Sequence, residues 1–360
     1  MEKFMMILMS LISILYGVTM VYVNKMSRPG VYFGVTISKE VERDQVYIKL
    51  AKRYKVSCMV IAIITAATIL ILRNPLPLIF QIVISFIPFL MAHDGVKNLK
   101  VEKANIYDKE TYNKVLVNTD ISARKLSYKA AYLWLYLIPL AICLVSFYIG
   151  YKKFDLAPDK IPMHYDLAGN VNRYGAKTFG NYYFASLMNI VLTLIMFLSN
   201  LAILSMKQGV IQGSKEETIK RQVKARAAWS YYLLGLSIIM SAMMLIMQLM
   251  TSYGSNYSTW ILVATMIIVV YSIGLGIYIG MKYGSMGESY ENPNREGTER
   301  DDDKYWHFFG TIYVNKDDPS VFVPKKVGSG GTVNFGNKVG ILITIAIPVA
   351  IIALVIALTN

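Results

Sequence analysis

Charged side chains are scarce in this sequence of 360 residues: Asp, Glu, Lys and Arg together make up 17% of it, whereas soluble domains average about 25%. Cysteine occurs twice and histidine three times, while hydrophobic residues make up 55%. These shortages exclude a soluble enzyme, a secreted disulfide-stabilised domain and a disordered tail. The composition instead predicts a multi-pass membrane protein with modest loops.

The few reactive residues form no recognised catalytic or metal-binding pattern. HExxH, GxSxG and GxxxxGK(S/T) are all missing from the sequence. Cys58 and Cys143 lie within apolar runs, where free cysteine behaves as a small hydrophobic residue. We therefore expect no cofactor and no metal. Direct binding of nucleic acid is not expected either, because a basic membrane protein more often carries its positive charge in cytoplasmic loops.

Eight apolar runs are long enough to be membrane spans. They are Phe4–Val23, Val56–Leu72, Pro75–Ala92, Ala131–Ile149, Tyr182–Leu204, Trp229–Met250, Trp260–Met281 and Val339–Leu358. None contains Asp, Glu, Lys, Arg or His. Ionisable groups within a bilayer usually mark ion paths, proton relays or catalytic sites, so their absence disfavours a proton-coupled transporter and an intramembrane protease. The predicted fold class is an all-α polytopic membrane protein of about eight transmembrane helices.

The loops predict the orientation. Residues 24–55, 93–130, 205–228 and 282–338 carry 30 basic residues, and the remaining segments carry 7. By the positive-inside rule the first set is cytoplasmic. We expect a protein of the cell membrane with both termini outside.

The same loops divide the chain. Residues 1–92 hold three helices and the first cytoplasmic loop, residues 93–130 the second cytoplasmic loop, residues 131–204 a transmembrane hairpin with the extracellular loop 152–181, residues 205–281 the third cytoplasmic loop and two helices, residues 282–338 a β-rich cytoplasmic module, and residues 339–360 the last helix.

The last cytoplasmic loop has the pattern of short strands. β-Branched and aromatic residues alternate with Asn, Asp and Gly turns between residues 306 and 335. An isolated hairpin is barely stable, so we expect these strands to pack with residues 31–37 and 114–119 against the membrane face. The hypothetical surface for a cytosolic partner consists of Trp306, Tyr313, Asn315, Asp318 and Lys325.

The outer loop is the densest group of polar residues on its side of the membrane. Residues 161–165 and 170–174 can pair as a short extracellular β-hairpin, which places His164 and Asp166 on one face. Three interpretations remain open: a surface hairpin that caps the bundle, a contact site for an extracellular peptide, and a metal site, for which two ligands are too few. The hypothetical ligand-binding residues are His164, Asp166, Asn170 and Arg173.

Two loops resemble known families. Pro158, Ile161-Pro162-Met163-His164-Tyr165, Gly169 and Tyr174-Gly175 follow the pattern of the domain of unknown function numbered sixteen forty-eight, with Ala157 where that pattern has Leu. Tyr305-Trp306, Gly310–Pro319, Val323–Lys325 and Asn334–Gly336 resemble a second uncharacterised domain, numbered fifty-eight oh-eight. The first module is similar to part of the Sdp-type immunity proteins of Gram-positive bacteria. That resemblance implies protection from a secreted toxin, or a signal passed to a repressor at the membrane.

Three functions remain for the structure to address. The first is a non-enzymatic immunity or signal-receptor protein that senses an extracellular peptide, a toxin or an envelope factor, with the lipid bilayer and a cytosolic repressor as partners. The second is a permease or lipid-handling transporter, for which the spans supply few polar residues, among them Gln81, Asn189, Gln248 and small hydroxyl groups, as a polar path. The third is an enzyme at the membrane face, although no nucleophile–base pair is visible.

Overall fold

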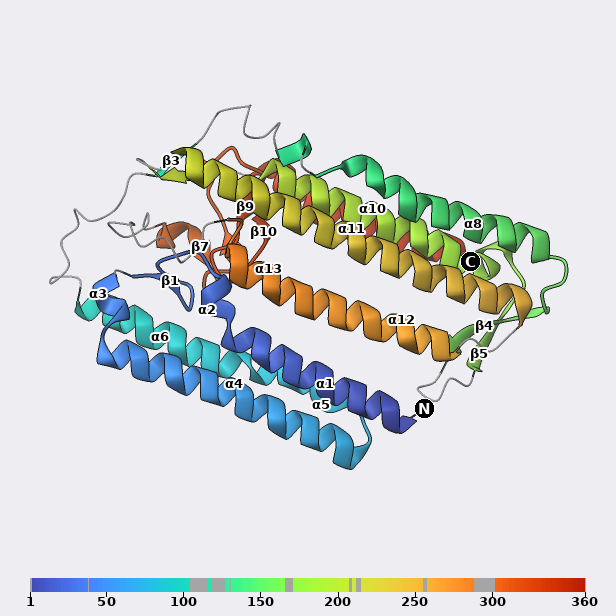
Figure 1. Ribbon diagram of the computed structural model, residues 1–360, viewed down its shortest axis with the longest axis horizontal. Coiled ribbons are helices and arrows are strands. Elements are labelled where there is room, and N and C mark those ends of the chain that lie inside the picture. The colour runs from blue at the N-terminus through green and yellow to red at the C-terminus, as the bar shows by residue number, and fades with distance from the viewer. Residues whose placement is uncertain are drawn as a thin grey trace.

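The computed structural model describes residues 2–37, 39–103, 115–117, 127–129, 131–165, 171–206, 209–211, 215–254, 258–287 and 302–359. Long helices run nearly side by side along the molecule, and short strands lie towards its two ends (Figure 1). We call the end with strands β4 and β5 the hairpin end, and the end with residues 302–337, hereafter the module, the module end. Both chain termini lie towards the hairpin end (Figure 1).

Seven helical segments in the described ranges are long and apolar enough to cross a membrane. They are built from α1 (Glu2–Val21), α4 (Gln45–Leu72), α5 (Leu76–Ile84) with α6 (Phe86–Glu102), a 3-10 turn (Leu133–Tyr136) with α8 (Leu137–Lys153), α10 (Phe184–Ser205), α11 (Lys215–Tyr253), and α12 (Ser258–Val270) with a π-helical turn (Tyr271–Leu275) and α13 (Gly276–Tyr283). The eighth predicted span is helix α14 (Lys338–Thr359), whose apolar stretch is the shorter Lys338–Ala353. The fold is thus the predicted all-α multi-pass membrane fold.

The boundaries differ from the apolar runs at several places. α4 begins at Gln45 and α11 at Lys215, well before their apolar runs, because a helix continues wherever its backbone remains bonded. Asp44 caps α4 by accepting a hydrogen bond from Val46 N at 2.8 Å. The third predicted span consists of two helices, since Ser85 separates α5 from α6.

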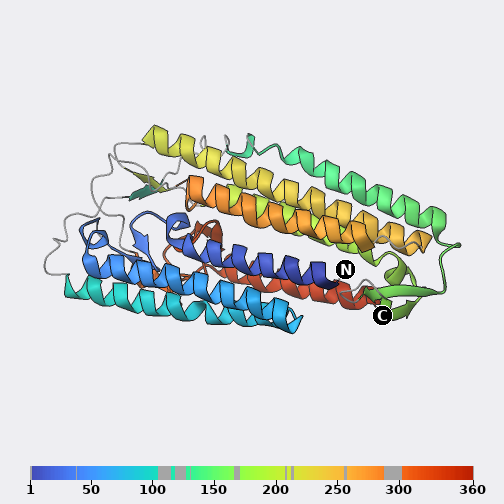
Figure 2. The ribbon, with the colours of Figure 1, turned by 60° about the horizontal axis from the view of Figure 1, so that its bottom comes forward.

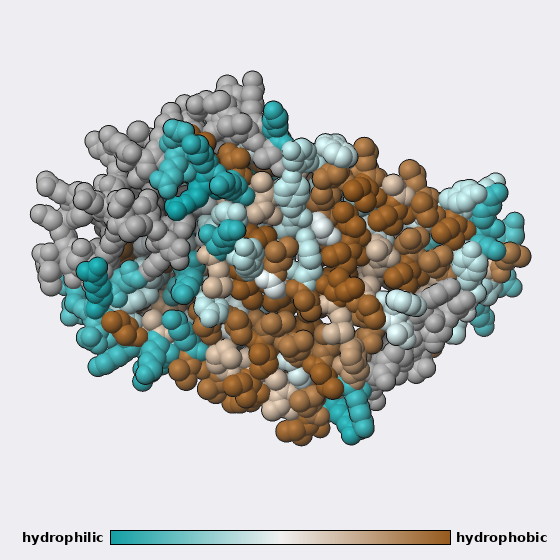
Figure 3. Space-filling model, in the orientation of Figure 1, coloured by the Kyte–Doolittle hydropathy of each residue, from teal (hydrophilic) through white to brown (hydrophobic). Residues whose placement is uncertain are grey.

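Large apolar side chains lie on the outside of the helices as well as between them. Ile71, for example, is 79% exposed and Leu144 is 71% exposed. In Figure 3 hydrophobic residues cover the middle of the visible face, and hydrophilic residues gather towards its ends. Monomeric soluble proteins rarely expose apolar patches of this extent, whereas a bilayer would cover them.

The helices form two groups, which the two views separate (Figures 1 and 2). In the first group α1 packs closely on α4, and a side chain at Gly17 would overlap with Ala62. Ser13 Oγ lies 2.7 Å from Gln81 Oε1, and Gln81 Nε2 donates to Ser13 O at 3.0 Å, which ties α5 to α1. The second group consists of α8, α10, α11 and α12–α13.

The remaining elements are short. Three helices connect longer ones: α2 (Val23–Met26), α3 (Lys39–Glu42) and α9 (Phe179–Tyr182). A 3-10 turn, Asp303–Tyr305, opens the module. The described strands pair as antiparallel hairpins or pairs: β1 (Val31–Tyr32) with β2 (Val35–Thr36), β3 (Val115–Val117) with β6 (Gly209–Ile211), β4 (Lys160–Tyr165) with β5 (Val171–Ala176), β7 (Trp306–His307) with β8 (Ile312–Tyr313), and β9 (Phe322–Pro324) with β10 (Gly331–Val333).

One predicted association is wrong. The strand within residues 114–119 exists as β3, but it pairs with β6 from the loop before α11 rather than with the module. A short alternating run predicts a strand without specifying its partner, because register and pairing depend on tertiary packing. Most of the loop 93–130 lies outside the described residues.

The other predicted association, between residues 31–37 and the module, is confirmed. A side chain at Gly34 would overlap with the carbonyl of Phe309, and Gly310 lies against Gly34 in turn. Both glycines have φ of +83°, a conformation that glycine adopts at little cost. His93 Nδ1 donates to Phe33 O at 2.6 Å, so α6 supports the same contact. The first loop and the module therefore interlock above the first helix group.

Candidate functional site

The hairpin end carries the first candidate site. β4 and β5 pair over Lys160–Tyr165 and Val171–Ala176, with Ile161 opposite Gly175 and His164 opposite Arg173. Ile161 is 1% exposed and packs with Ala157, Tyr182 and Tyr183. Apolar positions on one strand face thus attach the hairpin to the bundle, as the period of two requires.

Polar contacts fix the base of the hairpin on the helices. Lys177 Nζ donates to Ala157 O at 2.9 Å and lies 5.0 Å from the centre of the Phe154 ring. Asn181 Nδ2 donates to Ala176 O at 2.9 Å, and Thr178 caps α9 by accepting from Asn181 N at 3.2 Å. The segments before β4 and after β5 therefore attach the hairpin to the helices.

The opposite face of the hairpin is exposed and polar. His164 and Arg173 are exposed neighbours across the two strands, and His164 Nδ1 lies 2.5 Å from Asn172 Oδ1. The structure thus brings together two of the four predicted ligand-binding residues. Asp166 and Asn170 lie outside the described residues. In the part of the chain that is described, no group of three His, Cys, Asp or Glu residues is placed to hold a metal ion.

A buried polar network lies directly beneath the hairpin. Tyr182 OH is 3.1 Å from Gly150 O and 3.0 Å from Ser252 Oγ. Gln248 Nε2 donates to Tyr182 O at 3.2 Å, and Gln248 Oε1 accepts from Ser186 Oγ at 3.0 Å. These bonds join α8, the α9–α10 segment and α11 where the hairpin is attached.

The network continues along α11 as a stripe of buried polar side chains. Arg226, Ser237 and Gln248 are separated by 11 residues each, and so are Ser230, Ser241 and Ser252. Eleven residues complete three helical turns, so both series stay on one face. On α10, Asn189 Oδ1 accepts from Ser241 Oγ at 2.6 Å, and Asn200 Oδ1 accepts from Ser230 Oγ at 2.8 Å. This face of α11 is bonded to α10 over most of the bundle's length.

Only some of these buried polar residues are predicted from the sequence. Asn189 and Gln248 were identified because amides are rare within apolar runs, and the serines were not distinguished from other small residues. Arg226 was counted only as a basic loop residue. The 11-residue spacing was the signal that would have joined Arg226 to the stripe, since a repeated spacing marks one helix face.

Arg226 ends the stripe at the module end. The side chain is 1% exposed, and its two terminal nitrogens donate to Leu204 O at 3.1 Å and Met206 O at 2.9 Å. A cation at a helix C-terminus satisfies carbonyls that have no partner within the helix. Here a residue of α11 fixes the end of α10.

The end of α10 also touches the module. Ile203, Met206 and Met286 form a buried cluster onto which Phe322 of β9 packs. A side chain at Gly331 of β10 would overlap with Met206. α10 therefore runs from the hairpin cluster at one end to the module at the other.

The module carries the second predicted surface, and the structure places most of its residues inside. Trp306, Tyr313, Asn315 and Asp318 are all buried, whereas Lys325 is exposed. A partner could reach the four buried side chains only if the module opened.

Asn334, which is fully buried, organises this interior. Asn334 Oδ1 accepts from Asn315 N at 3.0 Å, while Nδ2 donates to the carbonyls of Asn315 and Asp318, both at 2.9 Å. Tyr313 OH donates to Asp318 Oδ2 at 3.1 Å. An Asn side chain at this position connects the turn after β8 to the end of β10, so these residues determine the fold of the module.

A cluster of charges joins the module to the first loop and α6. Asp302 accepts two bonds from Arg28, at 2.7 and 3.1 Å. Asp303 bonds to Lys326 and to Lys100, the latter at 3.0 Å. Thr36 Oγ1 donates to Asp303 Oδ1 at 2.6 Å. We call Arg28, Thr36, Lys100, Asp302, Asp303 and Lys326 the charge cluster.

The cluster keeps its acidic members ionised. Burial raises the pKa of Asp303, but the ammonium groups of Lys326 and Lys100 outweigh that effect and hold the pKa well below its usual range. Asp302 behaves alike: burial raises its pKa, but the Arg28 guanidinium lowers it by more, so the net shift is downward. Burial lowers the pKa of Lys326, and Asp303 partly offsets this shift. Ion pairs and hydrogen bonds of the charge cluster therefore hold the module to the first loop and to α6.

Comparisons with known proteins agree with the two sequence motifs. Residues 141–189, from α8 through the hairpin into α10, match a domain of unknown function, DUF1648. Residues 316–341, from the turn after β8 into α14, match a family of unknown function, DUF5808. No curated protein and no solved structure matches the chain. The predicted presence of both domains is therefore confirmed.

Proposed function

We propose that this chain is a non-enzymatic membrane receptor of the immunity or signalling type. In this proposal the hairpin end is extracellular and binds a peptide, a toxin or an envelope factor. The module end is cytoplasmic and passes the bound state to a cytosolic partner such as a repressor. The host would be a Gram-positive bacterium, in keeping with the resemblance of the hairpin motif to Sdp-type immunity proteins.

The observation that carries the proposal is the position of α10. Tyr182 and Tyr183, immediately before α10, pack against the hairpin, and Met206, immediately after it, packs against the module. A ligand can shift such a protein only if it binds one of two arrangements more tightly than the other. A displacement of the hairpin would be transmitted to the module, because the hairpin packs against one end of α10 and the module packs against the other.

The polar residues that a permease would need are hydrogen-bonded within the helix bundle. Gln81, Asn189 and Gln248 are buried and bonded to neighbouring helices. Interhelical hydrogen bonds of this kind stabilise packing in membranes. The amides of Gln81 and Gln248 are thus bonded to protein through both of their polar atoms, and Asn189 through its Oδ1.

A self-protection experiment tests the proposal. Cells without the gene are exposed to medium conditioned by wild-type cells, and growth is compared after complementation with wild type or with His164→Ala/Arg173→Ala. We expect deletion to sensitise the cells and the double variant to fail in rescue. Lys160→Gln is the matched control, because Lys160 is an exposed residue at the base of the same hairpin.

Membrane levels of all variants are compared by immunoblotting. Rescue by the double variant at equal levels would remove the hairpin face from the recognition surface. Unchanged growth of the deletion strain would reject self-protection altogether.

A further inference from the structure

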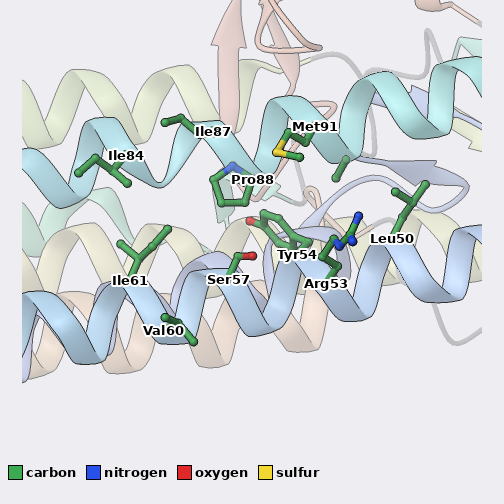
Figure 4. Close-up of a pocket in the computed structure, with 11 residues that line it drawn as sticks. Leu50, Arg53, Tyr54, Ser57, Val60, Ile61, Ile84, Ile87, Pro88 and Met91 are labelled. Atoms are coloured by element: carbon green, nitrogen blue, oxygen red, sulfur yellow. The ribbon is translucent and has the colours of Figure 1, made fainter.

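A groove opens between α4 and the α5–α6 pair, on the side of the first helix group (Figure 4). Its volume is about 350 Å³. Val60, Ile61, Ile84, Ile87 and Met91 give it mostly apolar walls. Arg53 and Ser57 are its polar residues apart from the buried Tyr54.

The groove lies beside the break between α5 and α6. The two helices meet at Ser85, and Pro88 follows within the first turn of α6. Proline has no N–H to donate to the carbonyl four residues earlier, which is that of Ile84. Both Ile84 and Pro88 line the groove, so the groove includes the point at which the helix is interrupted.

The groove crosses the level at which α4 changes from charged to apolar. Lys49, Lys52, Arg53 and Lys55 precede Val56, after which α4 has no charged residue up to its end at Leu72. The lining extends along α4 from Leu50 to Ile61, a length of about 16 Å at 1.5 Å per residue. One end of the groove is thus at headgroup level, and the other lies within the hydrocarbon.

Arg53 is available at the headgroup end. Its side chain is exposed, and none of the described residues forms a hydrogen bond or an ion pair with it. Lys49, Lys52 and Lys55 on the same helix add positive charge, and Asp94 on α6 is an exposed acidic residue outside the lining. The local balance is strongly positive.

We propose that the groove binds an anionic phospholipid, with one acyl chain between α4 and α5–α6 and the phosphate on Arg53. Apolar walls suit an acyl chain, and the arginine fork binds phosphate through two parallel hydrogen bonds. Basic residues next to a membrane also attract anionic lipids. This binding is independent of the ligand proposed for the hairpin.

Lipid retention by the purified full-length protein tests the proposal. The protein in detergent is mixed with phosphatidylglycerol or phosphatidylcholine of identical chains, and bound lipid is counted by native mass spectrometry. We expect about fivefold preference for phosphatidylglycerol, the factor that corresponds to about 1 kcal/mol for one basic residue at the surface. Arg53→Gln should abolish the preference, and Lys224→Gln, a change at an exposed lysine of α11 in the second helix group, should keep it.

A second variant tests the acyl-chain part. Met91 is 61% exposed, so Met91→Trp can narrow the groove without entering the core, and it should reduce retention of both lipids. Equal retention of the two lipids by wild type, or equal losses in Arg53→Gln and Lys224→Gln, would overturn the proposal. Undiminished retention in Met91→Trp would overturn it as well.

Discussion

Lys326 has no exposed side-chain surface, and its ammonium group bonds to Asp303. A buried charge is tolerated only when it is paired, because removal of one partner leaves the other desolvated. Asp303 also accepts bonds from Thr36 and Lys100, so one carboxylate serves the first loop, α6 and the module together. Its loss should therefore have more effect than the loss of an exposed charge.

Asp303→Asn should destabilise the module end by roughly 3 kcal/mol, the lower part of the range for breaking a buried ion pair. Thermal unfolding of the purified protein measures the change. Asp317→Asn is the matched control, since Asp317 is an exposed carboxylate of the same module. Equal melting temperatures for the two variants would show that the charge cluster contributes no net stability.

For single residues, the sequence predicted the polar or charged character of a side chain better than its position in the fold. Tyr313, Asn315 and Asp318 have the side chains of a polar surface, and a sequence gives no sign that Asn334 buries them. Arg28 and Lys326 counted correctly as loop charges, but their partners Asp302 and Asp303 are more than 20 residues away in sequence. Long-range pairing of charges has no local signal.

Among the helices, α11 and α10 are joined by hydrogen bonds along the polar stripe. The polar stripe on α11 ends at Arg226, which takes the last carbonyls of α10. Spans were predictable because each is an apolar run, and the hairpin was predictable because turn residues separate two strand-like segments. The partner of β3 was not, because three residues with alternating pattern fit many edges.

Arg226→Met should free the carbonyls of Leu204 and Met206, because it removes the guanidinium while it keeps an unbranched side chain in place of the arginine stem. We expect a loss of about 2 kcal/mol, in the range for leaving buried polar groups without partners, and faster amide exchange in residues 203–206. Hydrogen exchange with mass spectrometry measures it. Lys224→Met, at an exposed position two residues earlier, should leave the exchange unchanged, and similar exchange in both variants would refute the role of Arg226.

For the molecule as a whole, attachment of the module should depend on pH. The pKa values of Asp302 and Asp303 are lowered in the folded protein. The pKa of an Asp side chain in the unfolded chain is about 3.9. A depressed folded-state pKa gives stability that is present above the unfolded value and is lost as pH falls through the folded value. The melting temperature should therefore fall on acidification below about pH 4 to 5, and less so in Asp303→Asn. Parallel decreases in both proteins would assign the acid sensitivity to other groups.

The arrangement of the chain ends gives a further prediction at this scale. α1 and α14 both have their free ends towards the hairpin end (Figure 1). Tags on the two termini should be accessible from the same side of the membrane as a cysteine introduced at exposed Lys160, and from the opposite side to one introduced at exposed Lys325. Labelling with an impermeant thiol reagent in intact cells measures this. Labelling of Lys325→Cys from outside would reverse the orientation that the basic loops predict.

The interlock between the first loop and the module has a consequence for how the protein is made. Residues 28–36 leave the ribosome long before Asp302, Asp303 and Lys326, which bond to them or to each other. Until then Arg28 and Thr36 lack these partners. A chain truncated before residue 302 could insert the helices that precede this residue. At the module end, Arg28 and Thr36 would then be exposed to water instead of bonded to Asp302 and Asp303. The charge cluster can therefore form only after residue 326 has been synthesised, so the packing of the first loop is completed after most of the helices exist.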